Sequence, residues 1–447
     1  MNTQRVAIIG SGITGLSSCW LLHDRYDVTL FEKNDYIGGH TNTIDVYENE
    51  NRVPVDTGFI VYNEKNYPNL IGLFEQLGVQ TQKTDMSFAF SLNHGELEYS
   101  GSGIKGLFAQ HKNWFSPGHW RLLKEILRFN RLAHVALEEE NTQNTMSLGE
   151  FLHHHHFSSD MINHYLLPMG AAIWSCPVDT MLKFPVRSFL QFFANHGLID
   201  IKNRPQWRSV VGGSSEYVKN MLAKMEGKVT YDKGAIGVSR SEDQVKVKTV
   251  DGVQEFDKVI FACHADQALA LLEQPDDAES EILSAFQYEE NRTYLHTDLA
   301  LMPKRKSVWS SWNYLASSDP ESQQQMTATY WMNNLQRFEN MTDYLVTLNP
   351  FELPKDEKII TEICYEHPVF DQKAIQAQAQ LSTLQGNKNS WFCGSYSKYG
   401  FHEDALSSAV AVCGDFGVTP VWKQTSINKG SDKCEEQVGK QTKVLTS

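Results

Sequence analysis

The sequence has few cysteines, and none of them are paired. Seven cysteines are scattered singly over 447 residues, and no Cys-x-x-Cys pair occurs. This spacing argues against both a disulfide framework and a zinc cage, because each needs grouped cysteines. We therefore predict a chain without a metal site that works in a reducing, cytoplasmic compartment.

The sequence also lacks a long apolar run. The uncharged stretch in the middle of the chain, residues 161–178, is interrupted by Asn163, His164, Pro168 and Pro177. A helix that spans a bilayer needs about 20 mostly apolar residues, which this stretch does not supply. The apolar start of the chain is broken by glycines and has no small-residue cleavage pattern, so it does not resemble a signal peptide. We expect no membrane span.

Positive charge is scarce as well. Lys and Arg number 40 against 54 for Asp and Glu, which gives a net charge of −14. Because binding to nucleic acid depends on basic surface, this balance argues against a nucleic-acid partner. Residues 105–131 are a local exception, with six basic residues against Glu125, interleaved with Trp114, Phe115 and Trp120. Such a stretch is typical of peripheral contact with an anionic membrane, here the inner face; a solvated helix is the alternative.

Four consecutive histidines, residues 153–156, invite interpretation as a metal site. On a helix, adjacent side chains point in different directions, so four of them cannot converge on one ion. We predict that this run binds no metal.

The first 32 residues follow the order strand, glycine turn, helix, strand and acid. Residues 6–9 are a continuous apolar run typical of a buried parallel strand. Gly10, Gly12 and Gly15 then suit a tight turn, the approach of a pyrophosphate and close packing of helix on strand. Glu32, 22 residues after Gly10, is placed to accept hydrogen bonds from a ribose. The pattern predicts a dinucleotide site, and NAD and FAD both fit these residues.

Later motifs resemble the flavin-dependent amine oxidase and phytoene desaturase superfamily. The pair Gly38-Gly39 is followed by His40, where the superfamily usually has Arg, and residues 55–59 resemble the next family segment. A second glycine pair lies at 212–213, and residues 394–405 resemble the closing flavin motif. The resemblance implies FAD, bound without a covalent link. The predicted cofactor-binding residues are Gly10, Gly12, Ile13, Thr14, Gly15, Glu32, Gly38, Gly39, His40, Thr57, Gly58, Ala235, Ile236, Ala262, Gly394, Phe401, His402, Glu403 and Ala405.

The resemblance also implies the fold. We expect an α/β protein in which a Rossmann-like FAD-binding domain is built from discontinuous segments, with an inserted substrate domain of helices and β-sheet. The assigned FAD segments are 1–95, 206–290 and 385–422, the substrate segments are 96–205 and 291–384, and a polar, flexible tail is predicted for 423–447.

Some local features admit two interpretations. The aromatic and polar residues of 160–196, and Trp312, fit either an ordinary core or the wall of a substrate channel. Glu403 and Asp404 open the last predicted helix, where they fit a capping role as well. An earlier helix is clearer, because Pro68 suits its first turn and Gly78 suits its end.

The catalytic residues are less evident than the cofactor site. Many amine oxidases of the superfamily place a lysine near flavin N5, but this chain has none between Lys258 and Lys304. Its candidates for proton handling are His296, His402 and Tyr396, since imidazole titrates near neutrality and suits a general base. For each of them, a structural hydrogen bond is the alternative role.

Three functions are therefore considered. The first is an FAD-dependent oxidoreductase that removes a hydride from a C–H bond of an apolar substrate, such as a fatty acyl chain. The second is an amine oxidase that produces hydrogen peroxide, and the third is a non-redox flavoprotein, an isomerase or a binding module. The full chain is similar to a bacterial subfamily of NAD/FAD-binding, amine-oxidase-like proteins associated with cyclopropane-fatty-acid synthases, which implies a link to modified acyl chains.

Overall fold

The computed structural model describes residues 3–139, 146–174, 178–200, 204–317, 327–339 and 342–423, without the side chains of 171–174 and 178–179. The predicted tail, 423–447, lies outside the described residues except for its first residue. Within the described ranges, no helix is long and apolar enough to cross a bilayer.

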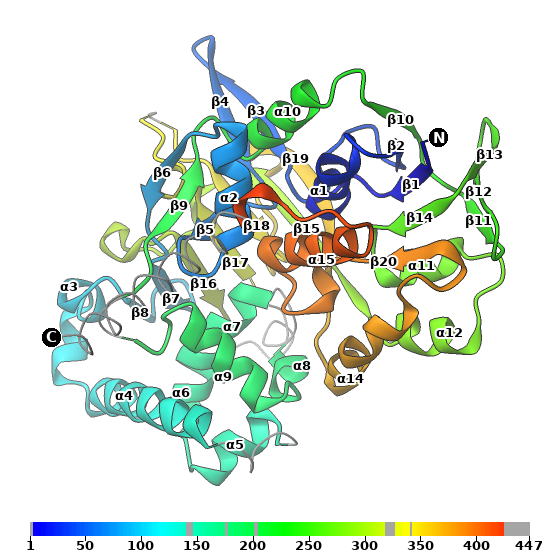
Figure 1. Cartoon of the computed structure of the whole chain (residues 1–447). Coiled ribbons are helices and arrows are strands. Elements are labelled where there is room, and N and C mark those ends of the chain that lie inside the picture. Colours follow the sequence, from blue (N-terminus) through cyan, green and yellow to red (C-terminus); the bar gives the residue numbers. More distant parts are fainter. Residues whose placement is uncertain are drawn as a thin grey trace, which may run out of the picture.

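A five-stranded parallel sheet forms the centre of the first domain (Figure 1). Its strands, in spatial order, are β10 (Val229–Lys233), β2 (Asp27–Glu32), β1 (Arg5–Ile9), β14 (Lys258–Phe261) and β20 (Ser390–Phe392). They come from three separate parts of the chain, which confirms the predicted α/β fold with a discontinuous Rossmann-like domain. All four pairings are parallel, as expected for strands buried on both faces.

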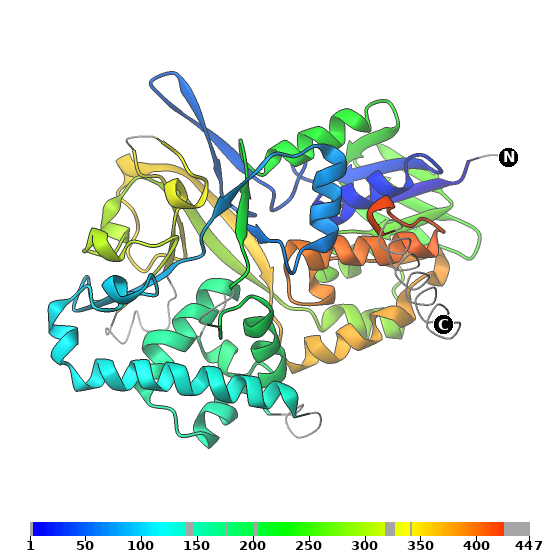
Figure 2. The same cartoon turned by 60° about the vertical axis from the view of Figure 1, so that its left-hand side comes forward.

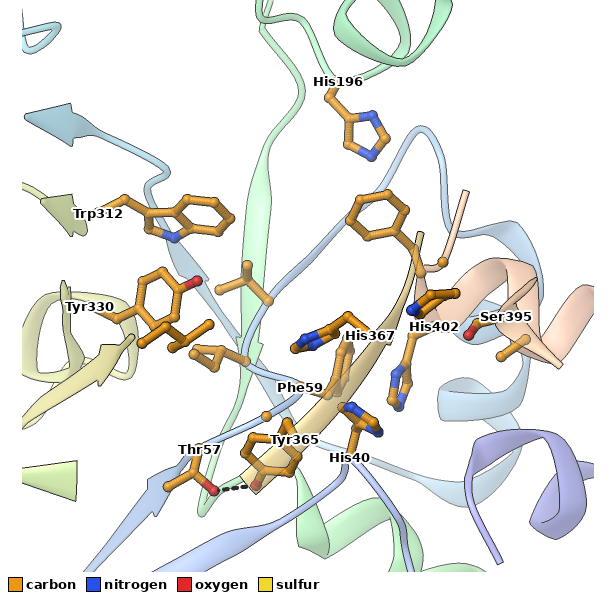
Figure 3. A pocket seen from close by; sticks show the side chains of 18 of the residues that line it. His40, Thr57, Phe59, His196, Trp312, Tyr330, Tyr365, His367, Ser395 and His402 are labelled. Atoms are coloured by element: carbon orange, nitrogen blue, oxygen red, sulfur yellow. Dashed lines mark hydrogen bonds between the residues drawn. The ribbon is translucent and has the colours of Figure 1, made fainter. Parts of the chain in front are cut away.

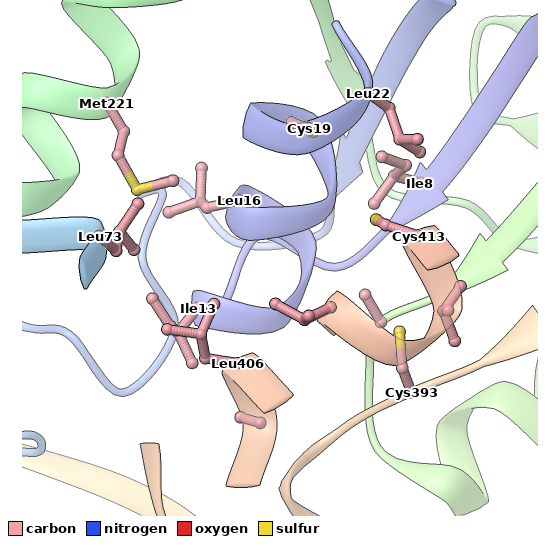
Figure 4. Packing of buried hydrophobic residues seen from close by; sticks show 14 of the residues in the cluster. Ile8, Ile13, Leu16, Cys19, Leu22, Leu73, Met221, Cys393, Leu406 and Cys413 are labelled. Carbon is pink, nitrogen blue, oxygen red and sulfur yellow. The ribbon is translucent and has the colours of Figure 1, made fainter. Parts of the chain in front are cut away.

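Helices from distant segments cover one face of this sheet. They are α1 (Ile13–Leu22), α2 (Pro68–Leu77), α10 (Ser215–Lys224) and α15 (His402–Asp415). Helix α1 packs directly against α15, so that Ile13 and Leu16 meet Leu406 in a buried cluster (Figure 4). The predicted bounds of α2 are confirmed, since Pro68 is its first residue and Gly78 ends it with a φ of 71°.

The opposite face is covered by a small antiparallel sheet and three helices. These elements are β11 (Gly237–Arg240), β12 (Val245–Thr249), β13 (Gly252–Phe256), α11 (Ala265–Leu271), α12 (Asp277–Ser284) and α14 (Gln372–Gln380). Ala374 and Ala377 of α14 are buried in this core. Residues 372–384 therefore pack with the first domain, not with the substrate segments to which they were assigned.

A seven-stranded mixed sheet forms the second domain. Its strands, in spatial order, are β19 (Ile359–Pro368), β15 (Tyr288–His296), β18 (Leu345–Leu348), β17 (Thr327–Trp331), β16 (Trp312–Ala316), β7 (Phe88–Leu92) and β8 (Leu97–Ser100). Strand β7 pairs in parallel with β16, so it belongs to this sheet although the predicted FAD segment ran to residue 95. The boundary was misplaced because β7 lies beside its partner only after the chain has folded.

Smaller elements connect the two domains. They are the hairpin β3 (Thr43–Glu48) and β4 (Asn51–Asp56), the strands β5 (Tyr62–Asn63), β6 (Thr81–Thr84) and β9 (Trp207–Val210), and the short helix α13 (Met332–Leu335). Strand β9 pairs with both β5 and β6, and so joins the end of the helical segment to the first part of the chain.

A helical layer lies along one side of the seven-stranded sheet (Figure 2). Its helices are α3 (Ile104–Leu107), α4 (Pro117–Glu138), α5 (Leu148–His154), α6 (Ser159–Met161), α7 (Leu167–Trp174), α8 (Val178–Leu182) and α9 (Val186–Asn195). A π-helical turn, Ile162–Leu166, precedes α7. Since Pro168 has no N–H to donate, the carbonyl of His164 is left free, and the Tyr99 hydroxyl donates to it instead.

Candidate functional site

A cavity of about 2050 Å³ runs from the glycine loop after β1 to helix α4. Ordinary small-molecule sites measure roughly 300–1,000 Å³, so this one has room for a dinucleotide and a second ligand. Its walls come from both domains and from the helical layer.

The glycine loop forms one end of the cavity. A Cβ on Gly10 would lie 2.8 Å from the carbonyl oxygen of Ala262, and one on Gly15 would lie 1.8 Å from the carbonyl oxygen of Gly10. These two glycines therefore permit close backbone packing. Gly12 differs, because a Cβ there would meet nothing within 4 Å and Gly12 lines the cavity. The space over Gly12 is where a pyrophosphate fits, at the N-terminus of α1.

Glu32 closes this end of the site. It ends β2, lines the cavity, and accepts hydrogen bonds from the Ser11 N–H at 2.8 Å and the Ser11 hydroxyl at 2.6 Å. Its other carboxylate oxygen accepts from the Asn34 N–H at 2.8 Å. The carboxylate is thus held in place, where it can also accept from a ribose hydroxyl. The donors and the open cradle fit a bound FAD.

The next part of the cavity is an aromatic chamber (Figure 3). The Thr57 hydroxyl and the Tyr365 hydroxyl are 2.7 Å apart, and the ring of His40 stacks on Tyr365 at 5.0 Å. Trp312 and Tyr330 face them from the seven-stranded sheet. Trp312 is thus a wall residue, one of the two roles that the sequence left open.

The aromatic residues of 160–196, for which the sequence allowed either a core or a channel wall, take both roles. Tyr165, Met169 and Phe192 line the cavity, whereas Phe189 and Phe193 fill the helical core. The aromatic segment is both a wall and a core, because a helix has about 3.6 residues per turn and so presents different residues to the cavity and to the core.

His402 lies at the start of α15 and lines the chamber. Its Nε2 is 3.1 Å from the Thr41 hydroxyl and 3.0 Å from the Tyr217 hydroxyl, and its ring stacks on Phe59 at 3.7 Å. Burial, and then the nearby His40, lower the pKa of His402 to about 3. The imidazole is therefore neutral at physiological pH.

A stability measurement tests this low pKa. The unfolded imidazole takes up a proton below about pH 6.5, while the folded one does so only near pH 3. Stability from His402 is therefore present at neutral pH and is lost as the pH falls below about 6.5. Between about pH 7 and about pH 5, the wild-type apoprotein should lose about 1 kcal/mol more free energy of unfolding than His402→Gln, allowing for water in the cavity. Urea denaturation at both pH values measures these free energies. An equal loss in the wild type and in His402→Gln would contradict this expectation.

The other two proposed catalytic residues differ in position. His296 does not line the cavity; its Nδ1 accepts from the Asp298 N–H at 3.0 Å and its Nε2 lies 2.7 Å from the Thr347 hydroxyl. Both nitrogens thus have hydrogen-bond partners within the protein, which favours a structural role, and a catalytic role for His296 stays a prediction. Tyr396 is buried and lines the cavity, and its hydroxyl has no hydrogen-bond partner among the described residues.

Two predicted cofactor residues lie elsewhere. Ile236 is 54% exposed and outside the cavity, while its neighbour Ala235 lines it. Glu403 does not line the cavity either; it accepts from the backbone N–H groups of Asn69 and Leu70, both at 3.0 Å. It therefore caps α2, because a carboxylate satisfies the free N–H groups at a helix start.

Most of the remaining predicted residues surround the cavity. Gly15 and Gly38 shape the loops without lining it, and the other lining residues from the prediction are Gly10, Gly12, Ile13, Thr14, Glu32, Gly39, His40, Thr57, Gly58, Ala235, Ala262, Gly394, Phe401, His402 and Ala405. A tight contact explains Gly58, where a Cβ would lie 2.2 Å from the carbonyl oxygen of His40.

The sequence interpretation missed two kinds of residue. Asp56 is fully buried, accepts from the Ser214 N–H at 2.8 Å and from Thr43 at 2.6 Å, and burial raises its pKa to about 7. It holds the turn after the second glycine pair against the β3–β4 hairpin, and the Asp-Thr-Gly motif was its only signal. Tyr365 and His367 line the chamber from β19, which carries no recognisable motif.

The chain matches one known protein family over most of its length. The family model for flavin-containing amine oxidoreductases matches residues 13–346. The chain belongs to the flavin-containing amine oxidoreductase family. It is an FAD-dependent oxidoreductase, as predicted. That the cradle described above holds the FAD stays a prediction.

Solved structures share the fold of this flavoprotein. A CLA-producing fatty acid isomerase from P. acnes is 16% identical with a TM-score of 0.64, and the match covers 92% of this chain and 98% of that one. Cyclohexylamine oxidase from Brevibacterium oxydans IH-35A is 12% identical with a TM-score of 0.65, over 93% and 100% of the two chains. Putrescine oxidase bound to putrescine is 15% identical with a TM-score of 0.64, over 92% and 98%. No curated protein matches the chain.

Proposed function

We propose that this flavoprotein oxidises the apolar chain of a lipid. The observation that carries the proposal is an apolar part of the cavity beside helix α4, here called the passage, which reaches the exposed side chains of Trp120 and Leu127. It is lined by Leu107, Leu123, Ile126, Tyr165, Met169 and Phe192. Such a passage excludes water from an extended hydrocarbon and offers it apolar contact along its length.

The chemistry follows from the cofactor. A bound flavin accepts a hydride, which is two electrons with one proton. In a desaturation the substrate loses that hydride from one carbon and a proton from the next, so that a C–C bond becomes a C=C bond. The chain around the chamber has to place the hydrocarbon, exclude water and receive the proton. His402 stays a predicted proton acceptor, but its lowered pKa of about 3 makes it a weak base.

Oxidation of an amine is the main alternative, and the passage argues against it. Among the described lining residues the carboxylates are Glu32, Asp85, Glu290 and Glu366, and the apolar passage contains none of them. Asp85 already accepts hydrogen bonds from the Ser87 and Ser311 hydroxyls at 2.6 and 2.7 Å. A cationic amine would thus enter without a counter-charge, which is costly in an apolar channel.

Anaerobic mixing distinguishes the alternatives. We expect phospholipid or fatty acid to bleach the flavin absorbance in a single turnover, with mass spectrometry finding the acyl product two hydrogens lighter. Bleaching by amines alone would overturn the proposal. A shifted double bond without net bleaching would instead assign the protein to the isomerases.

The passage ends in an apolar and basic surface, which we call the rim patch. It comprises the exposed side chains of Ile104, Lys105, Lys112, Trp114, Phe115, Trp120, Arg121, Lys124, Leu127 and Arg131. Trp120 and Leu127 also line the cavity. Lys105, Lys124 and Arg131 form no ion pair with any described residue. We infer that the rim patch contacts an anionic membrane, from which the lipid substrate enters; a location at the cytoplasmic face stays a prediction.

A charge introduced at the passage entrance tests whether the lipid enters there. Leu127 is 53% exposed, so Leu127→Glu should fold normally, yet it places an anion where an acyl chain and an anionic headgroup pass. We expect the KM for vesicle-bound lipid to rise at least about tenfold with a smaller change in kcat. Val135→Glu is the matched control, since Val135 lies on the same helix, is 46% exposed and does not line the cavity. Equal effects of the two substitutions would count against this entrance.

A further inference from the structure

A chain of hydrogen bonds runs through the seven-stranded sheet to the chamber. The Arg292 N–H donates to Asn349 Oδ1 at 2.9 Å, and Asn349 Nδ2 lies 2.7 Å from Asn291 Oδ1. Asn291 Nδ2 lies 3.0 Å from His367 Nδ1 and 3.1 Å from the Glu289 carbonyl oxygen. Asn291 is fully buried, so each of these groups depends on its protein partner.

The first donor determines the orientation of all the others. A backbone N–H can only donate, so the oxygen of Asn349 must face Arg292 and its NH₂ must face Asn291. Asn291 therefore accepts through its oxygen and points its NH₂ towards the Glu289 carbonyl and His367. An NH₂ group has no lone pair to offer, so Nδ1 of His367 must be the acceptor.

This order leaves one position for the proton of a neutral His367, namely Nε2. Burial, and then the neighbouring His40 and His264, lower the pKa of His367 to about 3. Those two neighbours have lowered pKa values too, about 4 and about 3, so all three rings are neutral at physiological pH. His367 is thereby restricted to the neutral form that carries its proton on Nε2.

We propose that the Nε2–H of His367 is a fixed hydrogen-bond donor to a lone-pair acceptor bound in the chamber. The ring extends from β19 into the chamber and lines the cavity (Figure 3). Nε2 has no acceptor among the described residues, although the chain orients the other side of the ring through three amide groups. Two sources supply such an acceptor, a ring oxygen or nitrogen of the flavin and an oxygen of the substrate. The proposal assumes that FAD binds in this cavity, but it does not depend on the substrate being a lipid.

Histidine NMR tests the tautomer without any activity. In protein labelled with ¹⁵N-histidine, the His367 signals, identified by their loss in His367→Gln, should report a neutral ring with the proton on Nε2. They should not titrate between about pH 5 and about pH 9. A proton on Nδ1, or titration within this range, would overturn the proposal. The tautomer and the titration are read from the wild type, and His367→Gln serves only to assign the signals.

Asn291→Asp then separates the two sources of the acceptor. The carboxylate accepts where the amide donated, so Nδ1 of His367 must carry a proton. As long as the ring stays neutral, which the same ¹⁵N signals report, Nε2 then has no proton to donate. A shift in the flavin absorbance and reduction potential without substrate would identify the flavin as the acceptor. An unchanged potential with KM raised about three- to tenfold, and kcat less affected, would identify the substrate.

Asn387→Asp controls for the added charge, since Asn387 is exposed and hydrogen-bonds only the Thr383 carbonyl among the described residues. It should leave the spectrum, potential and KM unchanged. A folded Asn291→Asp protein that matches this control in all three measurements would overturn the proposal.

Discussion

Gly12→Val should give a folded protein without colour. The new side chain meets no protein atom within 4 Å at its Cβ, so the apoprotein should keep its melting temperature. It fills the space over the N-terminus of α1, where the pyrophosphate must approach the backbone. We expect FAD affinity to fall at least about 100-fold, about 2.8 kcal/mol, as measured by titration of the apoprotein with FAD.

The neighbouring glycines show why position 12 is the informative one. A Cβ on Gly15 would overlap the backbone at Gly10, so Gly15→Val would test folding instead of binding. Gly414→Val is the matched control, because its Cβ also meets nothing within 4 Å and it lies in the last turn of α15. If Gly12→Val purified yellow with full occupancy, the glycine loop would not hold the dinucleotide.

Phe115→Glu should largely abolish binding to anionic vesicles. Phe115 is 88% exposed, the most exposed of the large apolar side chains in the rim patch. Burying such a side chain in an apolar medium is worth about 1.5–3 kcal/mol, and the new carboxylate also opposes the basic residues around it. Co-sedimentation with phosphatidylserine-containing vesicles should therefore weaken at least about 30-fold.

The control for this variant is another exposed aromatic residue. Tyr47, 68% exposed on the β3–β4 hairpin, lies outside the rim patch, and Tyr47→Glu makes the same change in charge. It should bind vesicles like the wild type. Binding that persists in Phe115→Glu, or that is equally strong to neutral vesicles, would remove the rim patch as a membrane contact.

Local signals in the sequence were sufficient for the FAD end of the cavity. A strand, a glycine turn and a helix within 22 residues depend on near neighbours, so the conformations of Gly10 and Gly15 follow from the sequence. The same holds for α2, whose first residue and end are marked by Pro68 and Gly78. Because both features are short-range, their prediction needed no knowledge of the remaining chain.

Glu403 illustrates what local signals could not predict. It sits in a motif that resembles a flavin segment, yet it caps a helix that begins 335 residues earlier in the chain. His296 is similar, because its partner Thr347 comes from a neighbouring strand far along the sequence. In each case the side chain's role depends on which segment packs against it, and that contact forms only when the domains assemble.

The sequence by itself determined the α/β dinucleotide-binding start of this protein, because glycines, capping residues and apolar periodicity act over short distances. The flavin amine oxidase family came from the resemblance of its later motifs. The tertiary structure decided which residues share one cavity. It joined the glycine loop to the apolar passage at α4, and it set the proton of His367 through amide groups on two other segments of the sheet. Those arrangements depend on packing between segments far apart in the chain, for which no short-range pattern exists.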